Sequence, residues 1–229
     1  MHCHLVFGVD DGAKTLDDSL TLLAKEYKDG ARGIIITPHF RKGMFEAPRD
    51  KVEEHFNILK EEAAKKWPDL ALYLGCEYHA HMDMTDDLDD ARYRMAGSRY
   101  VLTEFSESHQ AAYIMDRLYK VLSAGYIPIV AHAERYEAVY GHMDFIDEIR
   151  DRGALIQINA DSILGHEGWG MKRFCKKLIA NDFLDFVGSD AHNMKDRPCR
   201  IGECADFLAK KYGPDYMARI MIENPEALL

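Results

Sequence analysis

The chain has 229 residues, with 39 Asp and Glu against 29 Lys and Arg, so its formal net charge is -10 at pH 7. This acidic balance argues against a nucleic-acid binder, because such proteins neutralise phosphates with a basic surface. Apolar residues make up 47% of the chain, which is enough for a sizeable core. No run approaches the roughly 18 apolar residues of a spanning helix, and no signal segment is evident. We therefore expect a cytoplasmic protein without membrane insertion.

Strand and helix patterns alternate along the chain. A short strand over 2–5 opens it, and Thr15 begins a helix whose apolar residues recur at helical spacing until Gly30. The β-branched run at 33–39 has no polar alternation, which is typical of a strand buried on both faces. A helix then begins near Pro48. The later elements are strands at 70–77, 100–105, 126–132, 154–159 and 184–190, and helices at 111–125, 143–153, 171–182, 201–212 and 214–222.

Seven predicted strands, nearly all followed by a helix, indicate a parallel sheet. Such an α/β sheet is either open and doubly wound or closed into a barrel. No linker, low-complexity tract or internal repeat divides residues 1–229, so we expect a single domain. Both architectures place active sites at the carboxyl ends of their strands. Candidate functional residues are therefore expected at the strand ends.

Acidic and imidazole side chains stand at these predicted strand ends. Five of the six later strands end on such a residue, at His39, Glu77, Glu104, His132 and Asp190. A carboxylate that closes an apolar strand is costly to bury unless a cation balances its charge. Imidazole and carboxylate ligands without thiolate favour Zn, Mn or Fe over a soft-metal site. These positions predict a metal centre.

Two further patterns add candidates. His2 and His4 are two residues apart on a predicted strand, which directs both rings to one side, and Asp190 and His192 repeat this spacing. Each pattern also has an ordinary structural interpretation. A lone H-x-H pair can be exposed or satisfied in the core, and Asp190 can cap a helix. Asp11, in an Asp-Asp-Gly turn, can be only a turn former.

The motifs occur in a fixed order: H-x-H, Asp-Asp-Gly, Thr-Pro-His, two strand-end glutamates, His-x-Glu-Arg-Tyr and Ser-Asp-x-His. In this order the chain resembles the PHP (polymerase and histidinol phosphatase) phosphoesterases. Within them it is similar to the capsule-locus bacterial tyrosine phosphatases of the CpsB and YwqE kind. The resemblance runs from residues 2–4 through the 41–46 loop to Glu-Asn-Pro at 223–225. It includes loop sequence and spacing as well as ligand types.

The resemblance implies a PHP fold, a distorted, TIM-like (β/α)7 barrel, which agrees with the seven predicted strands. It also implies three divalent metal ions, for which we expect Mn²⁺, with Fe or Zn as alternatives. The ligands follow position by position: His2, His4, Glu77 and Asp190 for one ion; Asp11, His39 and His192 for a second; Glu104 and His132, with Glu77 as a bridge, for a third.

The resemblance also makes Arg135, Arg197, Asp11, His39 and His192 the catalytic residues. Four carboxylates and three divalent ions leave the site with a net charge of about +2, which suits a phosphate monoester dianion. A metal-bound water whose pKa is lowered to about 7 would supply a hydroxide for in-line attack on phosphorus. Inorganic phosphate would be the product.

Three arginines near the ligand positions are candidates for substrate binding. Arg135 and Arg197 resemble the family's phosphate-binding arginines, because a guanidinium fork matches phosphoryl oxygens. Arg135 can instead form a surface ion pair with Glu134 or Glu137. Arg41 can steer an acidic phosphopeptide towards the site, or it can be a solvated loop residue.

A phosphotyrosine substrate fits this site chemically. Its leaving phenol has a pKa of about 10, so protonation of the leaving group is less demanding than for a serine alkoxide. Phe40, Phe45 and Tyr136 lie beside ligand positions and can flank the ring or simply belong to the core. The cysteine-dependent phosphatase mechanism is excluded, because none of the five cysteines has Arg six positions further on.

We therefore expect a metal-dependent protein-tyrosine phosphatase. The resemblance implies that its substrate is the phosphorylated tail of a bacterial tyrosine kinase, and that it regulates capsule or exopolysaccharide synthesis. One alternative is a phosphatase for a small metabolite such as histidinol phosphate. Another is a catalytically silent module that binds metal or docks onto a kinase.

Overall fold

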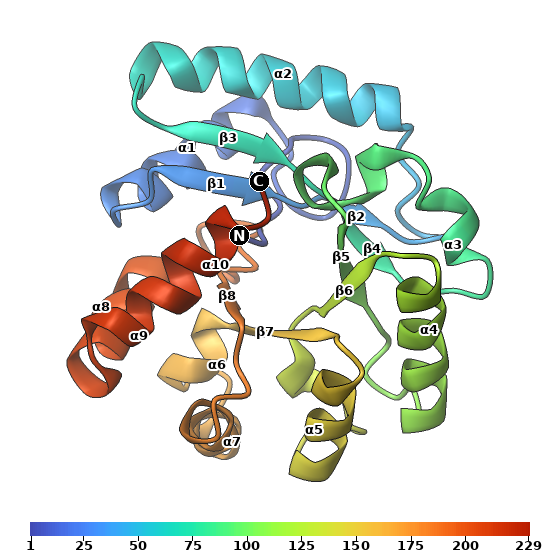
Figure 1. The fold of residues 1–229 in the computed structure, drawn as a ribbon. Helices are drawn as coiled ribbons and strands as arrows, with labels where there is room; N and C mark the ends of the chain where they lie inside the picture. The colour runs from blue at the N-terminus through green and yellow to red at the C-terminus, as the bar shows by residue number, and fades with distance from the viewer.

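Helices surround a ring of short parallel strands, and both chain ends lie near its centre in the view of Figure 1. The computed structural model describes residues 1–229. Its strands are β1 (Gly33–Ile36), β2 (His39–Phe40), β3 (Ala71–Leu74), β4 (Glu77–His79), β5 (Tyr100–Glu104), β6 (Ile127–Val130), β7 (Leu155–Asn159) and β8 (Phe186–Gly188). Its helices are α1 (Leu16–Lys28), α2 (Arg49–Lys66), α3 (Met84–Asp87), α4 (Ala111–Ser123), α5 (Met143–Asp151), α6 (Ala160–Leu164), α7 (Trp169–Ala180), α8 (Ile201–Tyr212), α9 (Pro214–Ala218) and α10 (Asn224–Glu226).

Two of the predicted strands are each split in the middle. β1 pairs with β3 and β2 with β4, both in parallel, so the runs 33–40 and 71–79 each form one interrupted strand. Pro38 has no N–H and separates β1 from β2. The hydrogen bond from Gly75 N–H to the Ile36 carbonyl, at 2.7 Å, keeps the two runs paired across the break. Each run therefore acts as one strand of the ring.

The remaining strands follow in the order β4-β5-β6-β7-β8, all parallel. The predicted strand over 2–5 closes the ring, but it is reduced to one bridge between Cys3 and Ala191. Backbone hydrogen bonds join it to Ala191 after β8 and to Thr37 after β1, at 2.9 Å each. A positive φ of 73° at His2 interrupts regular strand geometry there. Seven strand runs thus form the predicted distorted, TIM-like barrel.

The core fills the space between the ring and its helices. The largest cluster of buried apolar residues includes Ile156 on β7, Leu118 on α4 and Leu178 on α7. A second cluster includes Leu22 on α1 and Leu59 on α2. The longer helices α1, α2, α4, α5, α7 and α8 bury apolar residues at helical spacing. The short helices α3 and α6 were not predicted, because each has too few residues for a periodic pattern.

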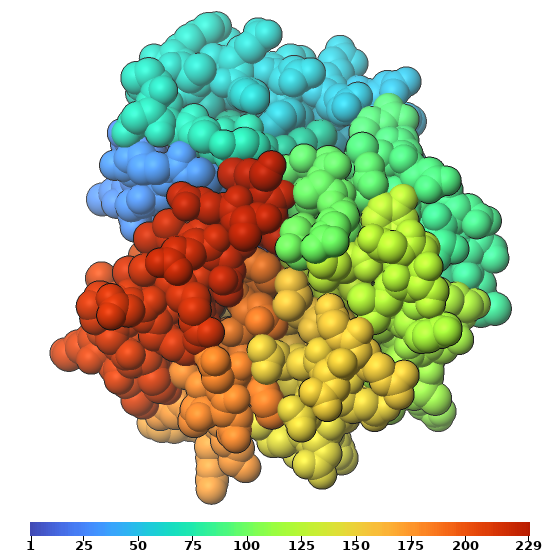
Figure 2. Space-filling model, in the orientation of Figure 1, coloured from blue at the N-terminus to red at the C-terminus, as the bar shows by residue number.

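The C-terminal segment closes the ring at the amino ends of the strands. Leu228 is buried in a cluster with Ile35, Met95, Leu102 and Phe186. Figure 2 shows this segment, in red, packed against the green part of the chain. The carboxyl ends of the strands open on the opposite side, where the strand-to-helix connections lie. No helix is both long and apolar enough to span a bilayer.

Candidate metal centre and active site

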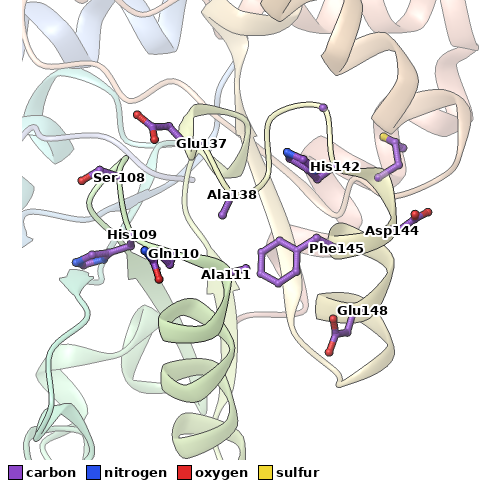
Figure 3. A pocket seen from close by; sticks show the side chains of 12 residues that line it. Ser108, His109, Gln110, Ala111, Glu137, Ala138, His142, Asp144, Phe145 and Glu148 are labelled. Atoms are coloured by element: carbon purple, nitrogen blue, oxygen red, sulfur yellow. The ribbon is translucent and has the colours of Figure 1, made fainter.

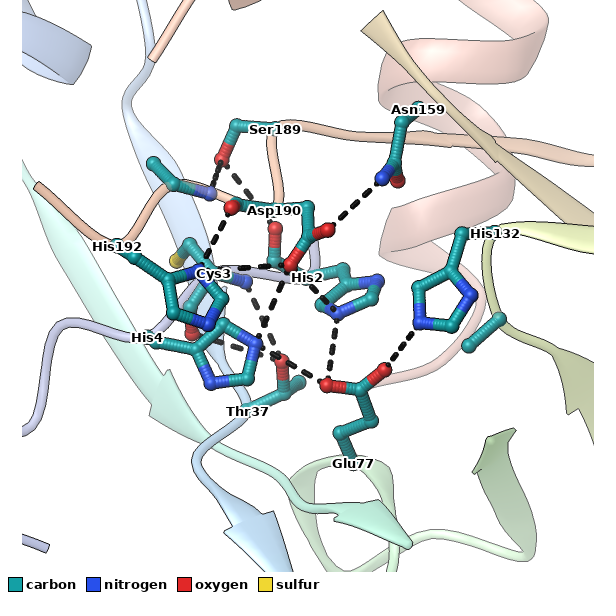
Figure 4. Close-up of polar contacts among 12 residues, drawn as sticks. His2, Cys3, His4, Thr37, Glu77, His132, Asn159, Ser189, Asp190 and His192 are labelled. Carbon is teal, nitrogen blue, oxygen red and sulfur yellow. Dashed lines mark hydrogen bonds and ion pairs between the residues drawn. The ribbon is translucent and has the colours of Figure 1, made fainter. Parts of the chain in front are cut away.

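The nine predicted metal ligands converge at the carboxyl ends of the strands, and Figure 4 shows several of them together. His39 lies on β2 and Glu77 on β4, Glu104 ends β5, and His132 follows β6. The other five come from the segment 2–11 and from the connection after β8. Eight of the nine fall into three overlapping groups, and within each group the ligand atoms lie within 4.8 Å of one another. The ninth, His132, contacts the third group.

The first group is His2, His4, Glu77 and Asp190, the set predicted for one ion. All four residues are buried. Glu77 Oε2 lies 3.1 Å from both His2 Nε2 and His4 Nε2. Asp190 Oδ1 lies 3.6 Å and 3.4 Å from the same two nitrogens. Two imidazoles and two carboxylates therefore face a common point.

The second group contains Asp11, His39 and His192, predicted for the second ion, and also His4. Asp11 Oδ1 lies 3.4 Å from His192 Nε2 and 3.6 Å from His39 Nε2. Asp11 is the one exposed member. The prediction assigned His4 to the first ion alone, whereas its ring lies within reach of both groups.

The third group contains His39, Glu77 and Glu104. His39 Nδ1 lies 3.1 Å from Glu77 Oε2 and 3.7 Å from Glu104 Oε2, so the His39 ring faces two groups through its two nitrogens. His132 Nε2 lies 2.8 Å from Glu77 Oε1 and 3.9 Å from Glu104 Oε1. Glu77 is therefore central, as its predicted bridging role requires.

Seven buried atoms of these groups lack hydrogen bonds. Buried polar atoms without partners are rare in folded proteins and costly. Imidazole nitrogens and carboxylate oxygens are suitable ligands for divalent transition metals, so the residues present fit a metal cluster. The buried, unpartnered atoms are His2 Nε2, His4 Nε2, His39 Nδ1, Glu77 Oε2, Glu104 Oε2, Asp190 Oδ1 and His192 Nε2.

Burial and neighbouring charges shift the pKa values of the carboxyl and imidazole groups in the cluster. Burial would raise the pKa of Glu77, but the charges of His2 and His39 outweigh it and hold that pKa well below its usual value. Burial and then the charge of Glu77 raise the pKa of Glu104 to about 8. Burial lowers the pKa of His39 to about 4. Divalent cations would balance the negative charge of the carboxylates. The His39 imidazole is neutral at neutral pH, which is the form that binds a metal ion.

Outer hydrogen bonds determine which nitrogen each histidine presents. His4 Nδ1 lies 2.9 Å from Asp10 Oδ2, and His2 Nδ1 lies 2.9 Å from Gln157 Oε1. His192 Nδ1 lies 2.9 Å from the carbonyl of Asp190. An acceptor at Nδ1 places the proton there and leaves Nε2 free. The three rings therefore present Nε2 to the cluster.

Asp10 is a functional residue that the sequence analysis missed. Its Oδ2 accepts from the His39 backbone N–H at 3.0 Å as well as facing His4, and its Oδ1 accepts from Gly12 N–H at 2.9 Å. Side-chain atoms at position 12 would lie 2.2 Å from the His4 carbonyl, which explains the glycine. In Asp-Asp-Gly the first aspartate orients a histidine and the second faces the cluster. The doubled aspartate signals two carboxylates at this turn but does not show which of them takes which role.

Gln157 and Asn159 were also missed. Gln157 Oε1 accepts from the His132 backbone N–H at 2.9 Å and faces His2, while its Nε2 donates to Asn159 Oδ1 at 2.9 Å. Asn159 Nδ2 donates to Asp190 Oδ2 at 2.9 Å. This buried chain of amides holds three predicted ligands in place. Its sequence signal is two polar residues at period two in the otherwise apolar strand β7.

Replacing Asp10 with Asn is expected to weaken metal binding about 10- to 100-fold, because outer partners of ligand histidines contribute that much. The amide removes the charge that holds the proton on His4 Nδ1. Titration of the chelated protein with Mn²⁺, followed by calorimetry, measures the change. Asp17→Asn, on the exposed side of α1, is the control. Equal affinities for the two variants would contradict the role of Asp10.

The two predicted phosphate-binding arginines lie together at the cluster. Arg135 Nη1 and Arg197 Nη2 each donate to Asp190 Oδ2 at 2.8 Å. Both line a cavity of about 260 Å³ whose wall also includes Asp11 and His39. Arg135 forms its other ion pair with Glu167. The alternative that Arg135 pairs with a neighbouring glutamate on the surface is therefore wrong.

Arg41 and Phe45 also line this cavity. Phe45 stacks on the His39 ring, with centroids 5.0 Å apart and planes 11° apart. Phe40 and Tyr136, the other aromatic candidates, are buried, and neither lines the cavity. Of the three aromatic side chains, only Phe45 can therefore flank a bound ring.

The chain has a second H-x-H pair, His79 and His81, which lies outside the ligand groups, as does Cys3. His79 Nε2 lies 3.1 Å from Ser106 Oγ, and His81 Nε2 lies 2.6 Å from the Tyr78 hydroxyl, so neither belongs to the ligand groups. Cys3 is buried in the second core cluster, where burial raises the pKa of its thiol well above the usual value. This environment does not support a thiolate nucleophile.

Known proteins match the whole chain. The family described as capsular polysaccharide synthesis, CpsB/CapC, matches residues 1–229. The tyrosine-protein phosphatase CpsB of Streptococcus pneumoniae is 35% identical over 235 residues, which cover 100% of this chain and 97% of that protein. The tyrosine-protein phosphatase YwqE of Bacillus subtilis (strain 168) is 30% identical over 230 residues, covering 100% and 90%.

A solved structure also matches the fold. It comes from work on YwqE from Bacillus subtilis and CpsB from Streptococcus pneumoniae, described as unique metal-dependent tyrosine phosphatases. The TM-score is 0.91 at 30% identity, and the match covers 100% of this chain and 92% of the solved one. With its predicted ligands gathered at the carboxyl ends of a barrel, the chain belongs to the CpsB/CapC family.

Proposed function

We propose that this protein is a metal-dependent tyrosine-protein phosphatase. The observation that carries the proposal is the set of buried, unpartnered imidazole nitrogens and carboxylate oxygens that face one another beside two arginines. Its relatives CpsB and YwqE carry this activity in their names. The site joins a metal cluster to a phosphate-binding wall, which is the combination that a phosphomonoester requires.

Three divalent ions, with Mn²⁺ as our first choice, would be held by the eight ligands of the three groups together with His132. When bound, such ions lower the pKa of water and neutralise developing charge on phosphoryl oxygens. Glu77 would be shared between ions, because its two oxygens face imidazoles of all three groups. Asp10 and Gln157 hold the proton on the outer nitrogens of His4 and His2, respectively.

The chain's own groups would bind and orient the phosphate. Arg135 and Arg197 converge on Asp190 Oδ2, which fixes both guanidinium groups. Arg135 also donates to Glu167 through Nη2, and the N–H donors that remain on the two arginines would bind phosphoryl oxygens. Phe45, at the wall of the cavity, would contact the phenyl ring of phosphotyrosine. Arg41, on the same wall, would attract the substrate's negative charge.

We further propose that the substrate is a phosphorylated bacterial tyrosine kinase, dephosphorylated on its tail, and that the protein thereby regulates capsule or exopolysaccharide production. Membership of a capsular polysaccharide synthesis family supports this assignment. A polypeptide substrate also suits the exposed apolar side chains that surround the site, as argued below.

The proposed function predicts metal-dependent hydrolysis of phosphotyrosine. Protein chelated and reloaded with Mn²⁺ should cleave p-nitrophenyl phosphate and phosphotyrosine peptides, and chelated protein should not. Free Mn²⁺ at a hundred times the Kd of one site adds about 2.7 kcal/mol to the free energy of unfolding through that site alone. For a chain of this length, that raises Tm by roughly 5 to 10 °C.

Histidinol phosphate, assayed side by side, distinguishes the alternatives. A strong preference for histidinol phosphate would overturn the tyrosine phosphatase and favour a metabolite phosphatase. Bound Mn²⁺ without hydrolysis of any of these esters would favour the silent metal-binding module.

A further inference from the structure

A second and larger hollow lies beside the catalytic cavity. It has a volume of about 740 Å³ and separates the amino ends of α4 and α5. Figure 3 shows Phe145 pointing into this space, with Ala111 and Ala138 beside it. We call it the α4–α5 groove. Nothing in the catalytic scheme above uses it.

The wall of the groove adjoins the wall of the catalytic cavity. Glu107 lines the catalytic cavity and the next residue, Ser108, lines the groove. The Glu137 N–H donates to the Glu107 carbonyl at 3.0 Å, which ties the two walls together, and Arg135 is only two residues before Glu137. An extended chain advances about 3.3 Å per residue. A peptide with its phosphotyrosine in the cavity can therefore reach the groove within a few residues.

The groove is acidic, whereas the catalytic wall carries arginines together with the carboxylates of Asp11, Glu104 and Glu107. The groove is lined by Glu137, Asp144 and Glu148 and by no Lys or Arg, whereas three arginines line the catalytic cavity. Glu137 and Asp144 are exposed and form no ion pair, while Glu148 lies 3.4 Å from Arg152. The two helix amino ends contribute about half a positive charge each, less than the carboxylates. The groove thus suits a cationic side chain.

Exposed apolar side chains gather on the same face. Of the nine large apolar residues that are exposed, four lie between the carboxyl end of a strand and the following helix, and a fifth, Trp169, begins α7 after the short helix α6. Clustered exposed apolar residues typically mark contact surfaces for macromolecules. A small metabolite would not reach them, whereas a polypeptide would. They are Met44, Met82, Tyr140, Trp169 and Met194.

We propose that the α4–α5 groove binds the polypeptide segment that flanks the substrate's phosphotyrosine and selects a Lys or Arg within that segment. The proposal rests on the proposed phosphatase function and adds a sequence preference to it. The carboxylates of Glu137 and Asp144 bind the cationic side chain, and Phe145 packs against its methylene stem.

Matched peptides test this preference with the Mn²⁺-loaded full chain. Two series of phosphotyrosine peptides differ only in Lys or Glu, placed in turn at each of the four positions on either side. At the best position, wild type is expected to show kcat/KM at least roughly threefold higher for Lys, since exposed ion pairs contribute modestly. The preference should shrink at 1 M salt, where the screening length is about 3 Å.

A pair of double variants locates the preference. Glu137→Gln with Asp144→Asn should abolish it. Asp147→Asn with Asp151→Asn changes the net charge equally on the same helix, outside the groove, and should preserve it. Equal kcat/KM of wild type for Lys and Glu peptides, or a preference for Lys that persists in the Glu137→Gln, Asp144→Asn variant, would overturn the proposed role of the groove. Absence of any p-nitrophenyl phosphate or peptide hydrolysis would instead overturn the phosphatase function itself.

Discussion

Replacing Glu77 with Gln is expected to lower the phosphatase activity more than about 100-fold. This loss is larger than the loss that is typical when an outer partner of a metal ligand is replaced. Glu77 Oε2 lies 3.1 Å from nitrogens of His2, His4 and His39, and Oε1 lies 2.8 Å from His132. The amide keeps the size of the side chain but removes its charge. It also turns an N–H₂ group towards at least one imidazole. Glu77 belongs to the ligand sets of two proposed ions and contacts His39 of the remaining set, so more than one ion position is affected at once.

Metal analysis and kinetics together check this result. The variant should bind fewer Mn²⁺ ions per chain than wild type and should lose the thermal stabilisation that Mn²⁺ provides. Circular dichroism after chelation shows whether the variant folds, so a loss of ions is not confused with unfolding. Glu61→Gln, on the exposed surface of α2, is the matched control. A Glu77→Gln protein with full ion content and full activity would contradict the shared-ligand role.

Replacing Arg135 with Ala is expected to lower kcat/KM for phosphotyrosine by about 100- to 1,000-fold, the range for loss of one donor to developing charge. Its guanidinium lines the catalytic cavity and donates to Asp190 Oδ2 at 2.8 Å. Arg135→Lys should recover only part of the loss, because an ammonium group cannot form a fork on two oxygens. Inhibition by inorganic phosphate should weaken in parallel.

Arg197 shares the same carboxylate oxygen as Arg135, so the two substitutions should not be additive. A double-mutant cycle on kcat/KM measures this coupling. Arg152→Ala, on the exposed end of α5, should leave both kcat/KM and phosphate inhibition unchanged. If Arg135→Ala retained wild-type kcat/KM and wild-type phosphate inhibition, Arg135 would not bind phosphate.

Much of the fold was predictable because it follows from local patterns. The buried run at 33–39 and the helical spacing after Thr15 identify their elements without any tertiary information. The break at Pro38 and the positive φ of His2 were not predicted as interruptions, because each depends on how neighbouring strands pair. The burial of Leu228, in the C-terminal segment that closes the ring, was not predicted either, since the residues that surround it are distant in sequence.

The candidate ligands were predictable for a different reason. A carboxylate or imidazole at the end of an apolar strand is costly unless something balances it, so Glu77 and His39 were recognisable from residue type and position. By contrast, Asp10 and Asp11 are neighbours of the same type, and no sequence rule distinguishes their roles. The structure separates them, because Asp10 turns towards His4 while Asp11 faces His192.

The sequence by itself determined the order of strands and helices, the ligand types and their place at strand ends, because periodicity and the cost of burying charge act locally. Only the tertiary structure decided which atoms meet. His2 and Gln157 are 155 positions apart, yet their contact selects the nitrogen that His2 presents to the cluster. Such contacts form only when the ring of strands closes, because closure brings the first residues of the chain beside β8 and β1.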